Sequence, residues 1–142
     1  MSFIAIQPET DPRELFTLGV RFHGHPGPFL ALGIRMGLLA LRLLGSTGFR
    51  GIAAEVETGT EPPISCLVDG IQVSTGCTAG KGNLLVRPLG QAAAIFSANG
   101  KRLRIEVRPE WLRRIAAEGA AEYLAAAVLD APVEELFRWT LS

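Results

Sequence analysis

The most hydrophobic stretch of the chain covers residues 29–45, in which Arg35 and Arg42 are the charged residues. It is shorter than the roughly 20 apolar residues that a membrane-spanning helix needs, so it predicts a buried helix. Gly33 and Gly37 are four residues apart and lie on one face of that helix. Because glycine has no Cβ, another backbone can approach closely there.

A second helix is predicted just before it, over residues 11–22. Asp11 stands at the N-cap position, Pro12 at the first helical position, and Glu14 three residues after the cap, which is the pattern of a capping box. The segment HGHPGPF, residues 23–29, follows with two glycines and two prolines. Two helices therefore flank a short, rigid loop that carries both histidines of the chain.

Apolar residues with period two or in short runs predict four strands, over residues 51–58, 84–88, 92–97 and 102–108. In the last of these, Leu103, Ile105 and Val107 alternate with charged residues and are expected to face inward. Asn99-Gly100 is a strong signal for a type I′ turn, because both residues tolerate positive φ. The third and fourth strands are therefore expected to form a hairpin.

From Ile64 the apolar residues follow the spacing i, i+3, i+4 and i+7, which predicts a short helix. Cys66, Asp69 and Val73 share another face of this helix. We therefore expect a polar face that includes a cysteine and a carboxylate.

Residues 109–130 predict a further helix, in which Gly119 is a potential break point. Asp130 is expected to cap a final turn over residues 132–139. The order of helices and strands does not alternate as in a parallel β-α-β protein. It predicts the α+β class, with an antiparallel sheet covered by helices mainly on one face.

The length of 142 residues fits one domain, residues 1–142. Lys and Arg number 14, as do Asp and Glu, which gives no electrostatic reason to expect nucleic acid or an anionic membrane as a partner. Hydrophobic residues make up 48% of the chain and its mean hydropathy is +0.27, so part of the apolar surface is expected in a homodimer interface. The N-terminus lacks the pattern of a secretory signal, which favours the cytoplasm.

The segment CLVDGIQVSTGCTAGKGN, residues 66–83, contains both cysteines of the chain. Its GCTAGKG resembles a nucleotide P-loop, but that loop is one residue too short and Gly82 stands where the hydroxyl that binds magnesium is required. A nucleotide site is therefore not expected. The small residues could still bind another anion, with Lys81 as the counter-charge.

Three interpretations of the cysteines remain open. A disulfide between Cys66 and Cys77 is sterically conceivable, but a reducing cytoplasm opposes it. Either cysteine could instead be an ordinary buried residue, and this applies more to Cys66 than to Cys77. Together with His23 and His25 they could also form a set of nitrogen and sulfur ligands suited to zinc or another late transition metal.

FHGHPGPFLALGIRMG and CLVDGIQVSTGCTAGKGNL together resemble the FmdE-like family of formylmethanofuran dehydrogenase proteins. The family pattern is HGHxCPG, then a helix with GxR, then CxxDAIQxxTGCTxGKGN. The two motifs cover about 35 residues, and their order and separation also match. The resemblance implies an α+β core similar to the second domain of glyceraldehyde-phosphate dehydrogenase, usually paired as a homodimer, with a cavity that can hold a metal such as zinc.

The resemblance also implies which side chains form that cavity. The candidate metal ligands or thiols are His23, His25, Cys66 and Cys77, and the pocket-lining residues are Asp69, Gln72, Thr75, Thr78, Lys81 and Asn83. Gly27 replaces the cysteine of the family motif, and Phe29 replaces the glycine after the proline. No cysteine follows Cys77, so the chain resembles the family core without the C-terminal zinc-ribbon domain of longer relatives.

Three functions follow as hypotheses. The first is a metal- or small-ligand-binding accessory protein of molybdenum or tungsten one-carbon oxidoreductases, with Lys81 holding an anionic ligand and an oxidoreductase complex as partner. The second is a stand-alone enzyme that acts on a small anionic substrate through a bound metal or through a Cys77 thiolate activated by His23 or Lys81. The third is a protein-interaction component whose cysteines only pack in the core.

Overall fold

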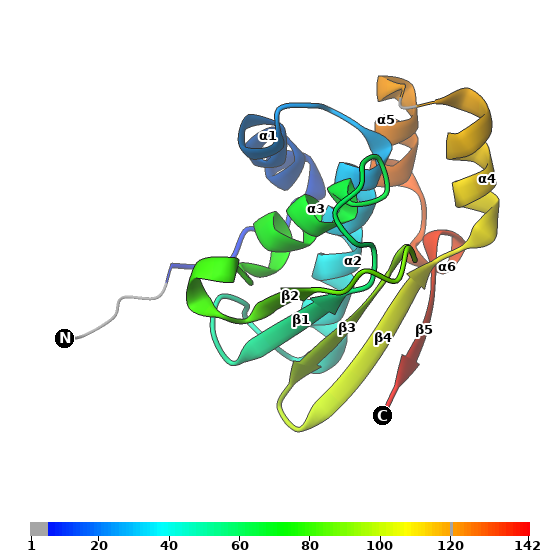
Figure 1. Cartoon of the computed structure of the whole chain (residues 1–142). Coiled ribbons are helices and arrows are strands. Elements are labelled where there is room, and N and C mark those ends of the chain that lie inside the picture. Colours follow the sequence, from blue (N-terminus) through cyan, green and yellow to red (C-terminus); the bar gives the residue numbers. More distant parts are fainter. Residues whose placement is uncertain (1–5, 120) are drawn as a thin grey trace.

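The computed structural model describes residues 6–119 and 121–142, and Figure 1 shows a single sheet with helices gathered on one side of it. The five strands lie in the order β2-β1-β3-β4-β5. The strands are β1 Ile52–Val56, β2 Leu84–Val86, β3 Ala93–Ala98, β4 Lys101–Val107 and β5 Phe137–Leu141. The helices are α1 Pro12–His23, α2 Pro28–Leu44, α3 Cys66–Thr75, α4 Pro109–Glu118, α5 Glu122–Asp130 and α6 Val133–Leu136, with the 3-10 turn η1 Ala79–Lys81. The α+β class is confirmed.

All strand pairs are antiparallel except β1 with β2, which are parallel. The segment of chain that connects these two strands contains α3. In β4, the predicted alternation is confirmed, because Leu103, Ile105 and Val107 are buried in the core. Asn99 and Gly100 both have positive φ, of 52° and 73°, as the type I′ hairpin requires.

Helix α2 is the centre of the fold, with 13 of its 17 residues buried. It contacts α1, α3, α5 and the sheet, so it has almost no solvent-facing side. Gly45 ends it in the left-handed conformation, with φ of 65°. Helix α1 also ends on a left-handed glycine, Gly24, and begins at Asp11, whose carboxylate accepts a hydrogen bond from the amide of Arg13 at 2.9 Å.

Helices α2 and α3 cross in direct backbone contact. A Cβ on Gly33 would overlap the carbonyl oxygen of Leu67, and a Cβ on Gly37 would overlap the hydroxyl of Ser74. From the other side, a Cβ on Gly70 would overlap the carbonyl oxygen of Leu30. The close approach that the glycine spacing predicted is therefore present.

Two sequence predictions about helix ends are wrong. In a capping box, the amide of Asp11 would donate to the carboxylate of Glu14. It donates to the carboxylate of Glu9 instead, which lies before the helix. Asp130 ends α5 rather than capping the last turn, because α6 begins only after Pro132.

The C-terminal segment also differs from the prediction. Residues 137–141 form strand β5 instead of continuing a helical turn. Phe137, Trp139 and Leu141 pair with Val107, Ile105 and Leu103 on the inner face of β4. The edge of β4 thus gains a hydrogen-bonded partner, which a local helical turn could not supply.

The predicted break at Gly119 is confirmed, since α4 ends there and α5 starts three residues later. The amphipathic helices around the core are short. None of the helices in the described part of the chain is both long and apolar enough to cross a membrane.

Replacing Gly70 with alanine should lower the free energy of unfolding by about 3 kcal/mol or more, because the added methyl group meets backbone that cannot rotate away. The gain in helix propensity, about 1 kcal/mol, is smaller than this steric cost. Denaturant unfolding measures the difference. Gly80→Ala is the matched control, because no atom lies within 4 Å of its Cβ position, and it should change stability by less than about 1 kcal/mol. Equal stabilities for the two variants would contradict the tight helix crossing.

Candidate functional site

A histidine and a carboxylate meet where α1 ends beside the first turn of α3. His23 Nδ1 lies 2.5 Å from Asp69 Oδ2, and their side chains are 13% and 34% exposed. Asp69 precedes Gly70, the residue at which α3 touches α2, so the helix crossing fixes where this carboxylate points. With Nδ1 hydrogen-bonded to a carboxylate, Nε2 of the neutral ring keeps its lone pair for a ligand.

Cys66 lies close enough to Asp69 to feel its charge. It is the first residue of α3, one helical turn before Asp69, and it is a partly buried free thiol. Burial raises the pKa of the Cys66 thiol, and the nearby Asp69 carboxylate raises it further. In the absence of a metal the thiol therefore stays protonated at neutral pH. We call His23, Cys66 and Asp69 the histidine–cysteine cluster.

Cys77 lies at the opposite end of α3, in the main hydrophobic core. Its exposed fraction is 0%, and its thiol contacts the carbonyl oxygen of Ile52 at 3.7 Å. Burial raises the pKa of Cys77 more than its hydrogen bond with Thr75 and the charge of Lys81 lower it. The environment is thus the opposite of the one that the activated-thiolate hypothesis requires.

The length of α3 separates the two cysteines. A ten-residue helix is about 15 Å long, whereas a disulfide needs Cα atoms within about 7 Å. Both cysteines are free, so the disulfide interpretation is wrong. Within residues 6–119 and 121–142, no three His, Cys, Asp or Glu side chains come close enough to hold a metal ion together. The structure therefore divides the predicted pocket between the two ends of α3.

The polar residues after α3 hold their own loop together. Thr75 donates its hydroxyl to the carbonyl of Ile71 and accepts from the amide of Cys77. Thr78 caps η1 through the amide of Lys81, and its own amide donates to Asn83. These side chains were expected to line the pocket, and each forms hydrogen bonds within its own loop.

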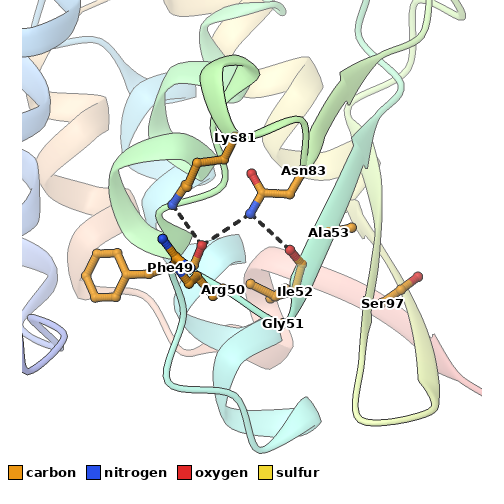
Figure 2. A pocket seen from close by; sticks show the side chains of 8 residues that line it. All are labelled: Phe49, Arg50, Gly51, Ile52, Ala53, Lys81, Asn83 and Ser97. Carbon is orange, nitrogen blue, oxygen red and sulfur yellow. Dashed lines mark hydrogen bonds between the residues drawn. The ribbon is translucent and has the colours of Figure 1, made fainter. Parts of the chain in front are cut away.

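Lys81 and Asn83 bind the main chain of the loop before β1. Figure 2 shows both side chains reaching the carbonyl oxygen of Phe49, at 2.7 Å from Nζ and 3.2 Å from Nδ2. Lys81 also donates to the carbonyl of Gly76, and Asn83 to that of Ile52. Phe49 itself has a φ of 68°, which is rare for an aromatic residue and which these bonds help to hold.

A shallow hollow of about 560 Å³ opens beside this loop, and Figure 2 shows the residues that line it. An anionic ligand there would compete with two carbonyl groups for Lys81. The sequence contained no signal for the left-handed Phe49 or for its bond with Lys81, because that bond joins residues 32 positions apart.

The remaining predicted residues, His25 and Gln72, lie apart from these bonds. The ring of His25 is exposed and folds over Gly27, where a Cβ would meet Nδ1 at 2.9 Å. Gln72 is partly buried on α3. Its main-chain carbonyl accepts a hydrogen bond from the amide of Gly76, the residue that caps the helix.

The protein is thus an α+β domain in which a histidine–carboxylate pair joins the end of α1 to α3, and a cysteine begins α3. Residues 22–139 match the family described as FmdE, molybdenum formylmethanofuran dehydrogenase operon. The chain therefore belongs to the FmdE family, as the two sequence motifs predicted. The matched region contains the whole histidine–cysteine cluster.

The chain is also similar to one curated protein and to one solved structure. It is 35% identical over 129 residues to a probable S-adenosyl-L-methionine-binding protein of Archaeoglobus fulgidus, a match that covers 84% of this chain and 34% of that protein. The chain thus spans about a third of the length of this relative. An FmdE-like protein of the tungsten formylmethanofuran dehydrogenase type, from Syntrophus aciditrophicus, has the same fold, with a TM-score of 0.74 and 24% identity over 97% of this chain and 77% of that one.

Replacing Asp69 with asparagine should increase the rate at which Cys66 reacts with iodoacetamide at pH 8. The carboxylate disfavours the thiolate, so its removal lowers the pKa of Cys66 and raises the thiolate fraction, by about threefold. The rate is measured by mass spectrometry of the labelled peptide, with Cys77 as an internal reference that should label only after unfolding.

Glu110→Gln is the control for this experiment, because it removes one exposed negative charge on α4, away from the cluster. It should leave the labelling rate of Cys66 unchanged. Rapid labelling of Cys77 in the folded protein would contradict its burial and restore the thiolate hypothesis.

Proposed function

We propose that this domain is a cytoplasmic metal- or small-ligand-binding accessory protein of molybdenum or tungsten one-carbon oxidoreductase metabolism, of the formylmethanofuran dehydrogenase type. The observation that carries the proposal is the 2.5 Å contact between His23 Nδ1 and Asp69 Oδ2, with Cys66 one helical turn away. Membership of the FmdE family supports the metabolic context and an oxidoreductase complex as partner.

We propose that a zinc ion is held by two side chains of the histidine–cysteine cluster, since among the described residues no three His, Cys, Asp or Glu side chains come close enough to bind a metal together. Metal-binding histidines typically donate a hydrogen bond from the N–H of their other ring nitrogen to a carboxylate, and Asp69 would accept this bond here. His23 Nε2 and the Cys66 sulfur would then be the protein ligands, an N/S pair that suits zinc. Two protein ligands leave coordination positions for a small molecule, and a bound zinc ion would act there as a Lewis acid.

Elemental analysis of protein purified without a histidine tag should find close to one zinc per chain. Zinc should be lost from His23→Gln and Cys66→Ser, whereas Asp69→Asn should bind it about tenfold more weakly or worse, because the carboxylate orients the ligand. Cys77→Ala is the matched control and should retain zinc, since Cys77 is buried at the other end of α3. Zinc that persists in Cys66→Ser but disappears in Cys77→Ala would contradict the site.

S-adenosyl-L-methionine is a second candidate ligand, on the single observation that the chain resembles a relative named for binding it. Calorimetric titration of the same variants distinguishes the two ligands. Binding of S-adenosyl-L-methionine that is unaffected by His23→Gln would favour this candidate with a separate site. The absence of any heat with the wild-type protein would exclude it.

The proposal includes a homodimer formed through α1. Leu18 and Phe22 are 57% and 59% exposed, although they are large and apolar, and they lie one turn apart on the helix that ends at His23. A second copy covering this face would remove apolar surface from water beside a ligand set that one chain leaves incomplete.

Light scattering should therefore give twice the chain mass for the wild type and the chain mass for Leu18→Lys. Leu85→Lys is the control, because Leu85 is similarly exposed, at 52%, but lies on edge strand β2. It should remain dimeric. A monomeric wild type would refute the homodimer, and a monomer only in Leu85→Lys would place the interface at the sheet.

A further inference from the structure

A separate hollow of about 530 Å³ lies between the C-terminal half of α2, the start of α1 and the turn from α5 to α6. This volume falls within the range of about 300 to 1,000 Å³ that is typical of small-molecule sites. Its apolar wall includes Leu38, Leu39, Leu129 and Val133, and its charged wall includes Arg35 and Arg42.

The two arginines are seven residues apart on α2, so they lie on one face of the helix. The half-buried Arg35 donates from Nη1 to the carbonyl oxygens of Val128 and Leu129, both at 2.8 Å, at the end of α5. Arg42 is exposed, and among the described residues its guanidinium has no hydrogen-bond or ion-pair partner.

Among the described residues that line the hollow, the positive charges of Arg35 and Arg42 exceed the negative charge of Asp130. Asp130 is the one carboxylate among the described residues that line it, and Asp130 is already paired with Arg13. Burial lowers the pKa of Arg35, Asp130 raises it, and the positive charge of Arg42 lowers it again. Both guanidinium groups have the same charge and line the same hollow, so an anion between them would stabilise both.

We propose that this hollow binds an organic anion, with its carboxylate, sulfonate or phosphate group on Arg42 and Arg35 and its apolar body against the leucine and valine side chains. The site is distinct from the histidine–cysteine cluster. Pro12 lines the hollow at one end of α1 and His23 stands at the other, and a 12-residue helix is about 18 Å long. The proposal therefore does not depend on a metal.

Two fluorescent probes of matched shape test the proposal: 8-anilinonaphthalene-1-sulfonate, which carries a sulfonate, and N-phenyl-1-naphthylamine, which lacks it. The sulfonate probe should bind the folded protein with one site per chain and about tenfold more tightly than the neutral probe. Arg42→Gln should weaken binding of the sulfonate about tenfold and leave binding of the neutral probe unchanged. Arg113→Gln, an exposed charge on α4, is the matched control and should change neither.

Near-UV circular dichroism of each variant verifies that the probe reports on folded protein. Chemical-shift changes at residues 38–42 and 129–133 on addition of the sulfonate would place it in the hollow. Equal affinity for both probes, or full binding of the sulfonate by Arg42→Gln, would overturn the proposal. Loss of binding in Leu18→Lys with retention in Arg42→Gln would also overturn it, by placing the probe on the apolar face of α1.

Discussion

The close crossing of α2 and α3 is the constraint on which the rest of the structure depends. Glycines on both helices allow backbone to touch backbone, so α3 cannot shift or rotate without steric overlap. Asp69 is next to Gly70 at this crossing and is thereby aimed at the end of α1. The contact between His23 and Asp69 is thus a consequence of helix packing. The sequence placed His23 in the loop after α1, but it is the last residue of that helix, so both partners are held by rigid elements.

Helix α3 also acts as a spacer. One end presents a partly buried thiol near the carboxylate that binds His23, and the other end places Cys77 in the core. The same residue type therefore has two roles, because burial removes Cys77 from solvent while Cys66 remains accessible. The run of polar residues after α3 serves the loop itself, with Lys81 and Asn83 holding the left-handed Phe49.

Charged side chains on this domain differ in how completely they are paired. Lys81 donates hydrogen bonds to carbonyl groups, and Arg104 is held by the buried carboxylate of Glu57 at 2.8 Å on the outer sheet face. Arg42, in contrast, faces a hollow with an apolar wall and no free carboxylate among its described lining residues. The whole chain has no net charge, so the excess of positive charge beside Arg42 belongs to one cavity and not to the whole surface.

Local sequence determined the parts that depend on near neighbours: the start of α1 at Asp11, the hairpin at Asn99-Gly100 and the break at Gly119. The glycine spacing in α2 and the two family motifs were also readable directly. Tertiary structure alone decided that residues 137–141 form a strand, because their stability comes from pairing with β4 and not from their own propensity. It also separated Cys66 from Cys77, since a rigid helix turns a short sequence interval into a long distance.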